Sequence, residues 1–261
     1  MGEHRYDGGM TMQNLKTLWQ QGYPQAIREG LIPGDLRVLV VGPHPDDFDA
    51  IGVTMRFLAE NGNPMHVAVI STSSGVDDDY RPGLSKDDKE QLREREQRNS
   101  ARYFGLSEHK LSFLSMAKDD QDQLLDNAEN YHALLGVVTD RLPDLIFLPH
   151  GNDTNNGHRV TCELVRQVAV RCGRPIVLFL NRDAKTVRMR TDLYMPFGQQ
   201  MGVWKAELLR FHDTQQQRNL VSRGHGFDER VLTLNAQIAA ELKLDAPFAE
   251  AFELEFYNVP L

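Results

Sequence analysis

The chain has 261 residues and a net charge of −8 at neutral pH, with 41% hydrophobic and 25% charged residues. This length and composition fit one large α/β domain or two small ones with an ample core, and the acidic balance weighs against a nucleic-acid partner. No stretch of 18 apolar residues occurs in the sequence, so we expect no membrane-spanning helix.

Continuous apolar runs rich in β-branched side chains recur along the chain, and helical patterns separate most of them. Such runs are typical of strands that are buried on both faces of a sheet. We predict strands at residues 36–41, 65–72, 109–115, 144–149, 175–180 and 250–257. The helical patterns cover residues 51–63, 86–105, 127–142, 158–172, 202–220 and 228–244.

Strands that alternate with helices indicate βαβ units, a mostly parallel sheet and right-handed crossovers. We therefore predict an α/β protein with a Rossmann-like three-layer fold, helices on both faces of the sheet, and a single domain of residues 1–261. Residues 1–30 precede the first buried strand and include a helical pattern at 12–30. We interpret them as an N-terminal helical extension that either caps the core or provides a contact in a homo-oligomer.

The sequence holds only two cysteines, Cys162 and Cys172. Both lie in the predicted helix at 158–172, too far apart around and along it for a local disulfide. We interpret them as packing residues on the helix face, and this cysteine usage favours the reducing cytoplasm.

Polar clusters directly follow two of the predicted strands. Residues 42–49 (GPHPDDFD) follow the strand at 36–41, and residues 149–158 (PHGNDTNNGH) complete and follow the strand at 144–149. Ligands of open α/β sheets bind at the carboxyl ends of the strands, so two neighbouring strands would bring both loops to one crevice. The candidate site residues in these loops, by side-chain type, are His44, Asp46, Asp47, Asp49, His150, Asp153, Asn155 and His158.

A mixed set of histidines and aspartates suits Zn²⁺ or another borderline divalent metal, and catalytic zinc sites use three protein ligands and leave a position for water. An aspartate beside that water takes its proton as general base, which would give the adjacent Asp46 and Asp47 separate tasks. The alternative is that HPDD is only a turn and helix cap, where Pro and Asp are common. Two such loops at two strand ends favour the metal site, but spacing alone leaves the choice of ligands open.

The segment PHPDDFDAIG at residues 43–52 resembles the signature of the LmbE-like, or PIG-L, family of zinc-dependent N-deacetylases. The resemblance runs from about residue 36 to residue 257. It implies an enzyme that releases acetate and a free amine from an N-acetylated amino sugar, often N-acetylglucosamine linked to inositol, malate, a lipid or a peptide. Further segments that resemble motifs of this family are REREQRNSARYFGL at 93–106, DTNNGHR at 153–159, FHDTQQQRNL at 211–220 and FAEAFELE at 248–255.

The resemblance assigns roles to the matching positions. His44, Asp47 and His158 would be the ligands of Zn²⁺, with Fe²⁺ or another divalent metal as the alternative. Asp46 would be the general base that activates water at the metal. Asp49 stands where the family carries its next acid, which we interpret as a support of the site or a helix-start residue.

One departure from the family pattern concerns the general acid. The family often has a histidine three residues before the last metal ligand, and this sequence has Asn155 there. An asparagine donates hydrogen bonds but cannot shuttle a proton. The acid role therefore falls to Asp46 after it has taken up a proton, to His150 or to His212.

Arg93, Asp153 and Gln215 are the candidate substrate-binding residues. Arg93 would contact a hydroxyl or phosphate of the substrate, but it lies in a highly charged helix, and such helix faces are usually just solvated. Gln215 and His212 would line the crevice or a lid, against the alternative that both are ordinary surface residues.

Two other functions are weighed against the N-deacetylase. The first is a metal-dependent hydrolase of another amide or of an ester, including a phosphate ester, whose hydrolysis commonly uses two metals and more acidic ligands. The second is a non-catalytic carbohydrate-binding protein on the same fold, because a fold does not fix a function. The intact HPDD motif weighs against this second alternative.

Overall fold

The computed structural model describes residues 18, 20, 22–72 and 75–259. Eight strands within this part of the chain form one sheet in the order β1-β7-β8-β6-β5-β2-β3-β4. β8 runs antiparallel to β6 and β7, and the other pairings are parallel. The strands are β1 (Gln25–Ala26), β2 (Val38–Gly42), β3 (Met65–Val69), β4 (Leu111–Phe113), β5 (Leu145–Pro149), β6 (Ile176–Asn181), β7 (Leu193–Phe197) and β8 (Phe248–Tyr257).

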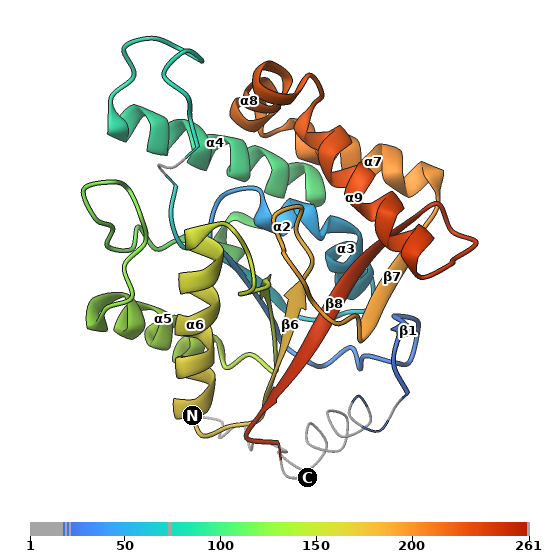
Figure 1. Ribbon diagram of the computed structural model, residues 1–261. Helices are drawn as coiled ribbons and strands as arrows, with labels where there is room; N and C mark the ends of the chain where they lie inside the picture. Colours follow the sequence, from blue (N-terminus) through green and yellow to red (C-terminus); the bar gives the residue numbers. More distant parts are fainter. Residues whose placement is uncertain (1–17, 19, 21, 73–74, 260–261) are drawn as a thin grey trace.

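Helices cover both faces of this sheet (Figure 1), which confirms the predicted mostly parallel, three-layer α/β fold. α5 and α6 pack on one face, α2, α3, α4 and α7 lie over the other, and α9 packs along β8. The helices are α2 (Asp47–Ala50), α3 (Gly52–Glu60), α4 (Lys86–Phe104), the short 3₁₀ helix η1 (Glu108–Lys110), α5 (Ala128–Arg141), α6 (Asn156–Arg171), α7 (Gln199–Arg210), α8 (Asp213–Arg223) and α9 (Phe227–Glu241).

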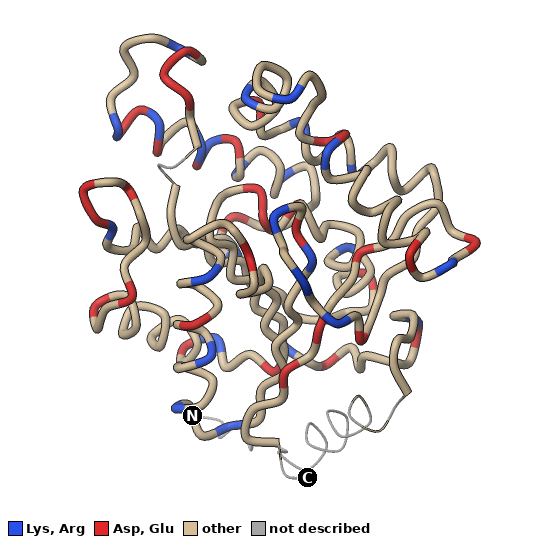
Figure 2. The backbone as a smooth tube through the Cα atoms, in the orientation of Figure 1, with Lys and Arg blue, Asp and Glu red and all other residues tan. Residues whose placement is uncertain are grey.

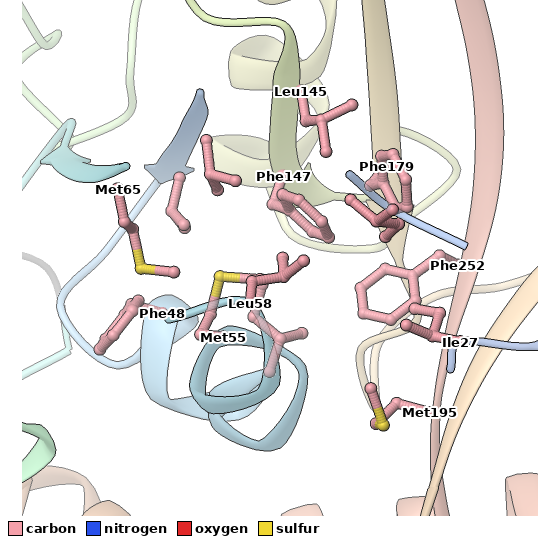
Figure 3. Packing of buried hydrophobic residues seen from close by; sticks show 14 of the residues in the cluster. Ile27, Phe48, Met55, Leu58, Met65, Leu145, Phe147, Phe179, Met195 and Phe252 are labelled. Atoms are coloured by element: carbon pink, nitrogen blue, oxygen red, sulfur yellow. The ribbon is translucent and has the colours of Figure 1, made fainter. Parts of the chain in front are cut away.

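Successive side chains of the central strands point to opposite faces and build two separate apolar cores. On one face, Phe147 of β5 and Phe179 of β6 stack with ring centroids 4.4 Å apart. Figure 3 shows Met55 and Leu58 of α3 on the same side, together with Phe48 of α2. Full burial of each such side chain contributes about 1.5–3 kcal/mol. The cores therefore make the sheet a rigid platform for the loops at its edge.

Two features of the second half differ from the sequence prediction. The helix predicted at 202–220 is two helices, α7 and α8, because the chain turns at Phe211 and His212. The turn allows the His212 side chain to enter the interior, where it is fully buried. β7 was not predicted, since its half-buried sequence LYMPF shows only a short alternation of buried and partly exposed residues.

Part of the helix predicted at 12–30 is wrong. Gln25–Ala26 is strand β1, which pairs with β7 at the edge of the sheet. Residues 12–17 of this predicted helix, and residues 19 and 21, lie outside the described residues. None of the helices in the described part of the chain combines the length and apolar composition that crossing a bilayer requires.

β2 and β5 are direct neighbours and pair in parallel register, with Val40 opposite Phe147. Their carboxyl ends therefore lie side by side at one edge of the sheet. The two polar loops start at this edge, as the switch-point rule for open α/β sheets requires.

Candidate active site

The first loop, residues 43–49, makes a tight turn at the end of β2. A Cβ at Gly42 would lie 3.1 Å from the backbone oxygen of His44, so the turn has little room for a side chain there. Asp46 has a left-handed backbone conformation with φ of 104°, which costs a non-glycine residue on the order of 1–3 kcal/mol. Because this conformation is unfavourable by itself, contacts from other elements must hold it.

The second loop, residues 150–158, is organised by its own side chains. Asp153 Oδ1 accepts a hydrogen bond from the Asn155 N–H (2.7 Å), and Asn155 Oδ1 accepts one from the Gly157 N–H (2.8 Å). Asn155 is thereby the N-cap of α6, and His158 lies in the first turn of that helix. A Cβ at Gly157 would lie 2.9 Å from the His44 ring, so the two loops are in close contact.

His44, Asp47 and His158 converge on one point, with one ligand atom of each lying within 4.8 Å of the others. His158 Nε2 is 3.5 Å from Asp47 Oδ1, and His44 Nδ1 is 3.6 Å from Asp47 Oδ2. Two imidazole nitrogens and one carboxylate oxygen form a donor set that catalytic zinc sites use. The chemistry and spacing of these residues therefore fit a divalent metal.

Electrostatic interactions shift the pKa values of Asp47 and His158 in opposite directions. Burial alone would raise the pKa of Asp47, but His158 and His44 lower it to about 2. Burial alone would lower the pKa of His158, but Asp47 and Asp153 raise it to about 8. A metal binds the neutral form of imidazole, so binding of a cation here would release a proton from His158.

Asp153 lies behind His158, with its Oδ2 atom 3.2 Å from His158 Nδ1. A carboxylate in this position fixes the orientation of the ring and leaves Nε2 for the metal. Thr186 Oγ1 lies 3.4 Å from the same carboxylate oxygen. Asp153 does not line the pocket over the cluster within the described part of the chain, so its position suits support of His158 rather than substrate contact.

Asp46 is held beside the cluster by two residues of α4. Arg93 Nη2 donates to Asp46 Oδ2 (3.2 Å) and to the Pro45 carbonyl, and Gln97 Oε1 accepts a hydrogen bond from the Asp46 N–H (3.0 Å). Burial raises the pKa of Asp46, against the opposing effect of Arg93. Only 1% of Arg93 is exposed, so the alternative of a solvated arginine is wrong.

A buried polar network lies behind the first loop and involves Gln97, Ser100, Asp49 and His212, each 0% exposed. Gln97 Nε2 (3.1 Å) and Ser100 Oγ (2.9 Å) donate to Asp49 Oδ2. His212 Nε2 lies 2.5 Å from the same oxygen. Since Gln97 also binds the Asp46 N–H, this network joins α4 and α8 to the strained residue of the first loop.

A pocket of about 260 Å³ opens over the cluster. Among the sequence-predicted residues, those on its wall are His44, Asp46, Asp47, Arg93, Asn155, His158 and Gln215. Gln215 Nε2 donates to the Gly75 carbonyl (2.7 Å), which fixes its side chain in the wall.

His150 and His212 are not among the described residues that line this pocket. His150 Nδ1 accepts a hydrogen bond from the Asn152 N–H (2.9 Å), and its Nε2 lies 3.5 Å from Glu253 Oε2. The Nε2 atom of His212 is engaged by Asp49. The geometry therefore does not support a general-acid role for either histidine.

Sequence reasoning missed Gln97 and Ser100, although α4 carries a signal for them. Arg93, Glu96, Gln97 and Ser100 are spaced i, i+3, i+4 and i+7, which places them on one helix face. All four are buried, and Glu96 accepts hydrogen bonds from the backbone and side chain of Thr214 in α8 (2.8 and 2.7 Å). Polar residues with the spacing of a buried helix face, inside an otherwise charged helix, thus indicated a buried polar network.

These features describe a three-layer α/β protein with a His-Asp-His cluster of metal-binding type at the carboxyl edge of its sheet. The sequence model of the PIG-L family, described as GlcNAc-PI de-N-acetylase, matches residues 39–169, just over half of the chain. The chain therefore belongs to the PIG-L family. None of the curated proteins matches the sequence.

Solved structures share the fold over most of the chain. The N,N'-diacetylchitobiose deacetylase from Pyrococcus horikoshii superposes with a TM-score of 0.70 at 16% identity, covering 96% of this chain and 92% of its own. The A40926 pseudoaglycone deacetylase gives 0.63 at 16% identity over 85% and 98% of the two chains. The 4-carboxy-2-hydroxymuconate hydratase from Pseudomonas putida gives 0.62 at 18% identity over 87% and 99%. At these identities the likeness shows the fold alone, and deacetylases and a hydratase both have this fold.

Proposed function

We propose that this protein is a metal-dependent N-deacetylase of an N-acetylated amino sugar of the N-acetylglucosamine type. The observation that carries the proposal is the position of Asp46 beside the His44, Asp47 and His158 cluster, on the wall of one pocket. Membership in a family described as GlcNAc-PI de-N-acetylase and the deacetylases of the same fold support it.

His44, Asp47 and His158 would hold Zn²⁺, with Fe²⁺ or another divalent cation as the alternative, because this donor set suits borderline metals. A cation bound there supplies Lewis-acid activation of water and of the amide carbonyl. Asp153 keeps the His158 ring oriented at its Nδ1 side. Asp47 remains ionised because its pKa is lowered to about 2 by the two histidines, although burial opposes this shift.

Asp46 would act as the general base. Its carboxylate takes a proton from the attacking water, and the water oxygen forms a bond to the acetyl carbon. The C–N bond then breaks, and the proton held by Asp46 passes to the leaving amine, which releases acetate and a free amine. Burial, which raises the pKa of Asp46, favours this temporary protonation.

Arg93 and Asn155 would serve this reaction without moving protons. Arg93 binds Asp46 Oδ2 and so keeps the other carboxylate oxygen available to the water. Asn155 Oδ1 is used by the Gly157 N–H, but its side-chain amide lines the pocket and can donate to the acetyl oxygen. Asp46 therefore carries both the base and the acid role.

The proposal is tested by hydrolysis of N-acetyl sugars with detection of the free amine, with and without a chelator. Asp46→Asn should lower kcat by roughly 10²–10⁴ with the metal retained, and His158→Ala should abolish stoichiometric metal binding. Asp79→Asn, in an exposed loop, is the matched control and should leave both unchanged. If the purified protein binds no divalent metal and both site variants hydrolyse amides normally, the proposal is wrong.

The same assay separates the alternatives. A phosphate esterase with two metals would need a second metal group, and the described residues offer Asp153, His158 and Asp183 within 4.8 Å. This group shares His158 with the first one and uses the carboxylate that supports its ring. A single bound metal per chain would therefore count against the esterase, and sugar binding without turnover would indicate a non-catalytic binding protein.

We also retain the cytoplasm as the proposed location. Cys162 and Cys172 are free thiols on α6 and at its C-cap. Cys162 is fully buried beside the apolar core of that face, which fits packing residues in a reducing compartment.

A further inference from the structure

One lysine is fully buried, and the proposed reaction does not use it. Lys205 of α7 is 0% exposed, although burial of an ammonium group is costly unless the group is paired and hydrogen-bonded. Burial lowers the pKa of Lys205, against the opposing effect of Glu250. The position of Lys205 in the interior therefore requires partners, and these lie on β8, α9 and α2.

The ammonium group of Lys205 donates hydrogen bonds to three separate elements. The acceptors are Glu250 Oε1 of β8 (2.7 Å), Asn235 Oδ1 of α9 (2.8 Å) and the Ala50 carbonyl at the end of α2 (2.6 Å). Figure 1 shows α7 beside α2 and α9 along β8. An ammonium group has three protons to donate, so these contacts use its whole capacity.

Glu250 supports the neighbouring helix, α3. Of the acidic residues along β8 (Figure 2), Glu250 is buried, with 2% exposed, and the others are partly exposed. Its carboxylate oxygens accept hydrogen bonds from the Val53 N–H (3.1 Å) and the Thr54 N–H (2.8 Å) in the first turn of α3. The N-cap of α3 is Ile51, whose side chain has no hydrogen-bond acceptor. Glu250 therefore provides the acceptors from a distant strand.

The corner between α2 and α3 depends on these contacts. α2 has only four residues, and a helix of about one turn is not stable by itself. The Ala50 N–H donates a hydrogen bond to the Asp46 carbonyl (3.0 Å), while the Ala50 carbonyl accepts one from Lys205. Ala50 therefore connects Lys205 to the residue that has the unfavourable left-handed backbone conformation.

α4 and Lys205 hold Asp46 from two sides. Gln97 of α4 accepts a hydrogen bond from the Asp46 N–H (3.0 Å), and Arg93 of α4 binds the Asp46 carboxylate. The contact of Lys205 with Ala50 acts on the Asp46 carbonyl instead. Both peptide groups of Asp46 are thus fixed, and rotation of either one would move its carboxylate relative to the metal cluster.

We propose that Lys205 is a positioning residue for Asp46, which acts through Ala50 and is itself held by Glu250 and Asn235. The inference rests on the proposed deacetylase function and adds to it a residue remote from the substrate. Lys205 is not among the described residues that line the pocket. A displacement of a reacting group by about 1 Å can lower the rate about 10²-fold, so loss of the Lys205 contact should lower kcat rather than weaken substrate binding.

The test removes the contact with Ala50 without leaving an unpaired charge in the interior. Lys205→Met alone keeps the length of the side chain but leaves Glu250 unpaired, which destabilises the fold. Lys205→Met combined with Glu250→Gln removes both charges. This double variant should lower kcat about tenfold, the value of roughly one hydrogen bond from a charged donor. KM should stay within threefold of wild type, and one divalent metal per chain should still bind. An unchanged kcat in the folded double variant, or a raised KM at unchanged kcat, would overturn the proposal.

Two controls separate positioning from stability. Glu250→Gln alone leaves the contact between Lys205 and Ala50 in place and should keep kcat within threefold of wild type. Leu134→Ala changes the core on the opposite face of the sheet. It should lower the free energy of unfolding and leave the kcat of the folded protein unchanged. A loss of kcat in either control as large as that in the double variant would contradict the proposal.

The Asp46→Asn background tests whether the effect passes through Asp46. In this background, Lys205→Met with Glu250→Gln should lower kcat no further, because substitutions that act through the same residue are not additive. A further tenfold loss of kcat would indicate a general structural effect and would contradict a positioning role.

Failure of the deacetylase function is distinguishable from failure of this inference. If the wild-type protein releases no amine from N-acetyl sugars, hydrogen exchange of the Ala50 N–H replaces kcat as the readout. The exchange should be about tenfold faster in the double variant than in Glu250→Gln, which keeps the Lys205 contact. Equal exchange rates in these two variants would contradict the inference.

Discussion

The two loops of the candidate active site are stabilised in different ways. The first loop contains Asp46 in a left-handed conformation and depends on Arg93 and Gln97 of α4 and, through Asp49, on His212 of α8. The second loop is held by Asp153 and Asn155, which bind backbone N–H groups two residues further along. Backbone hydrogen bonds to the β6–β7 connection, such as the one from the Thr154 N–H to the Lys185 carbonyl (3.1 Å), also hold it. The strained residue thus needs buried side-chain partners from distant helices, whereas the unstrained second loop is placed by local hydrogen bonds and by backbone pairing with a neighbouring connection.

The largest effect is expected from removing the buried partner of Asp49. His212→Leu should lower the free energy of unfolding by about 3 kcal/mol, because it leaves a buried carboxylate without its charged partner. Urea unfolding measures the change, and the exposed His109→Leu is the control, expected within about 0.5 kcal/mol of wild type. Equal effects of the two substitutions would show that the first loop does not depend on this contact.

The pH dependence of this stabilisation has a definite sign. Burial alone would lower the pKa of His212, but Asp49 outweighs it and raises the pKa above that of an unfolded histidine. The stabilisation by His212 is therefore complete below the unfolded pKa of about 6.5 and is lost as the pH rises through the folded pKa. The difference in unfolding free energy between wild type and His212→Leu should be larger at pH 6 than at pH 9. A difference that grows with pH would contradict the pairing.

Asp153→Asn tests the support of the second loop. The amide keeps the size of the side chain but loses the charge that faces His158 Nδ1 at 3.2 Å, so metal affinity should fall by roughly 10–100-fold. Metal titration of the apo protein measures this without any substrate. The control is Asp140→Asn, at an exposed residue of α5, which should leave the metal affinity unchanged. If Asp153→Asn binds the metal as tightly as the wild type, Asp153 does not support His158.

Gln97→Met tests whether the α4 contact acts through Asp46. The substitution removes the acceptor of the Asp46 N–H (3.0 Å) and should lower kcat about tenfold, the value of roughly one well-placed hydrogen bond. In the Asp46→Asn background the same substitution should lower kcat no further, because the effects of substitutions at residues that act together are not additive.

The control for this cycle is Gln91→Met, an exposed residue of the same helix. It should leave kcat unchanged in both backgrounds. A loss of kcat by Gln97→Met that is independent of Asp46→Asn would indicate a general structural role instead.

The smallest effect is expected for the local cap of the second loop. Asn155→Ala removes the acceptor of the Gly157 N–H (2.8 Å) and should destabilise the protein by about 1 kcal/mol. The control is Asn127→Ala at the N-cap of α5, where Asn127 accepts a hydrogen bond from the Asn130 N–H. It should lower the free energy of unfolding by the same amount and leave kcat unchanged. If Asn155→Ala lowers the free energy of unfolding as much as His212→Leu does, the two loops do not differ in how they are stabilised.

The sequence by itself determined the alternation of buried strands and helices and the two polar loops at strand ends. These follow from local periodicity and from side chains that act within a few residues, such as Asn155 at the start of α6. The motifs at His44, Asp46, Asp47 and His158 predicted a cluster of metal-binding type. The convergence of His44, Asp47 and His158 then required only that β2 and β5 be neighbours.

Only the tertiary structure decided which polar residues are buried and what they bind. Gln97 and Arg93 look like members of a charged surface helix, and His212 like part of a continuous helix, until α4 and α8 pack over the first loop. A buried polar group must find hydrogen-bond partners, and those partners lie up to 163 residues away in the chain. Short-range patterns cannot specify such partners, and for this reason the support of Asp46 became visible only in the folded protein.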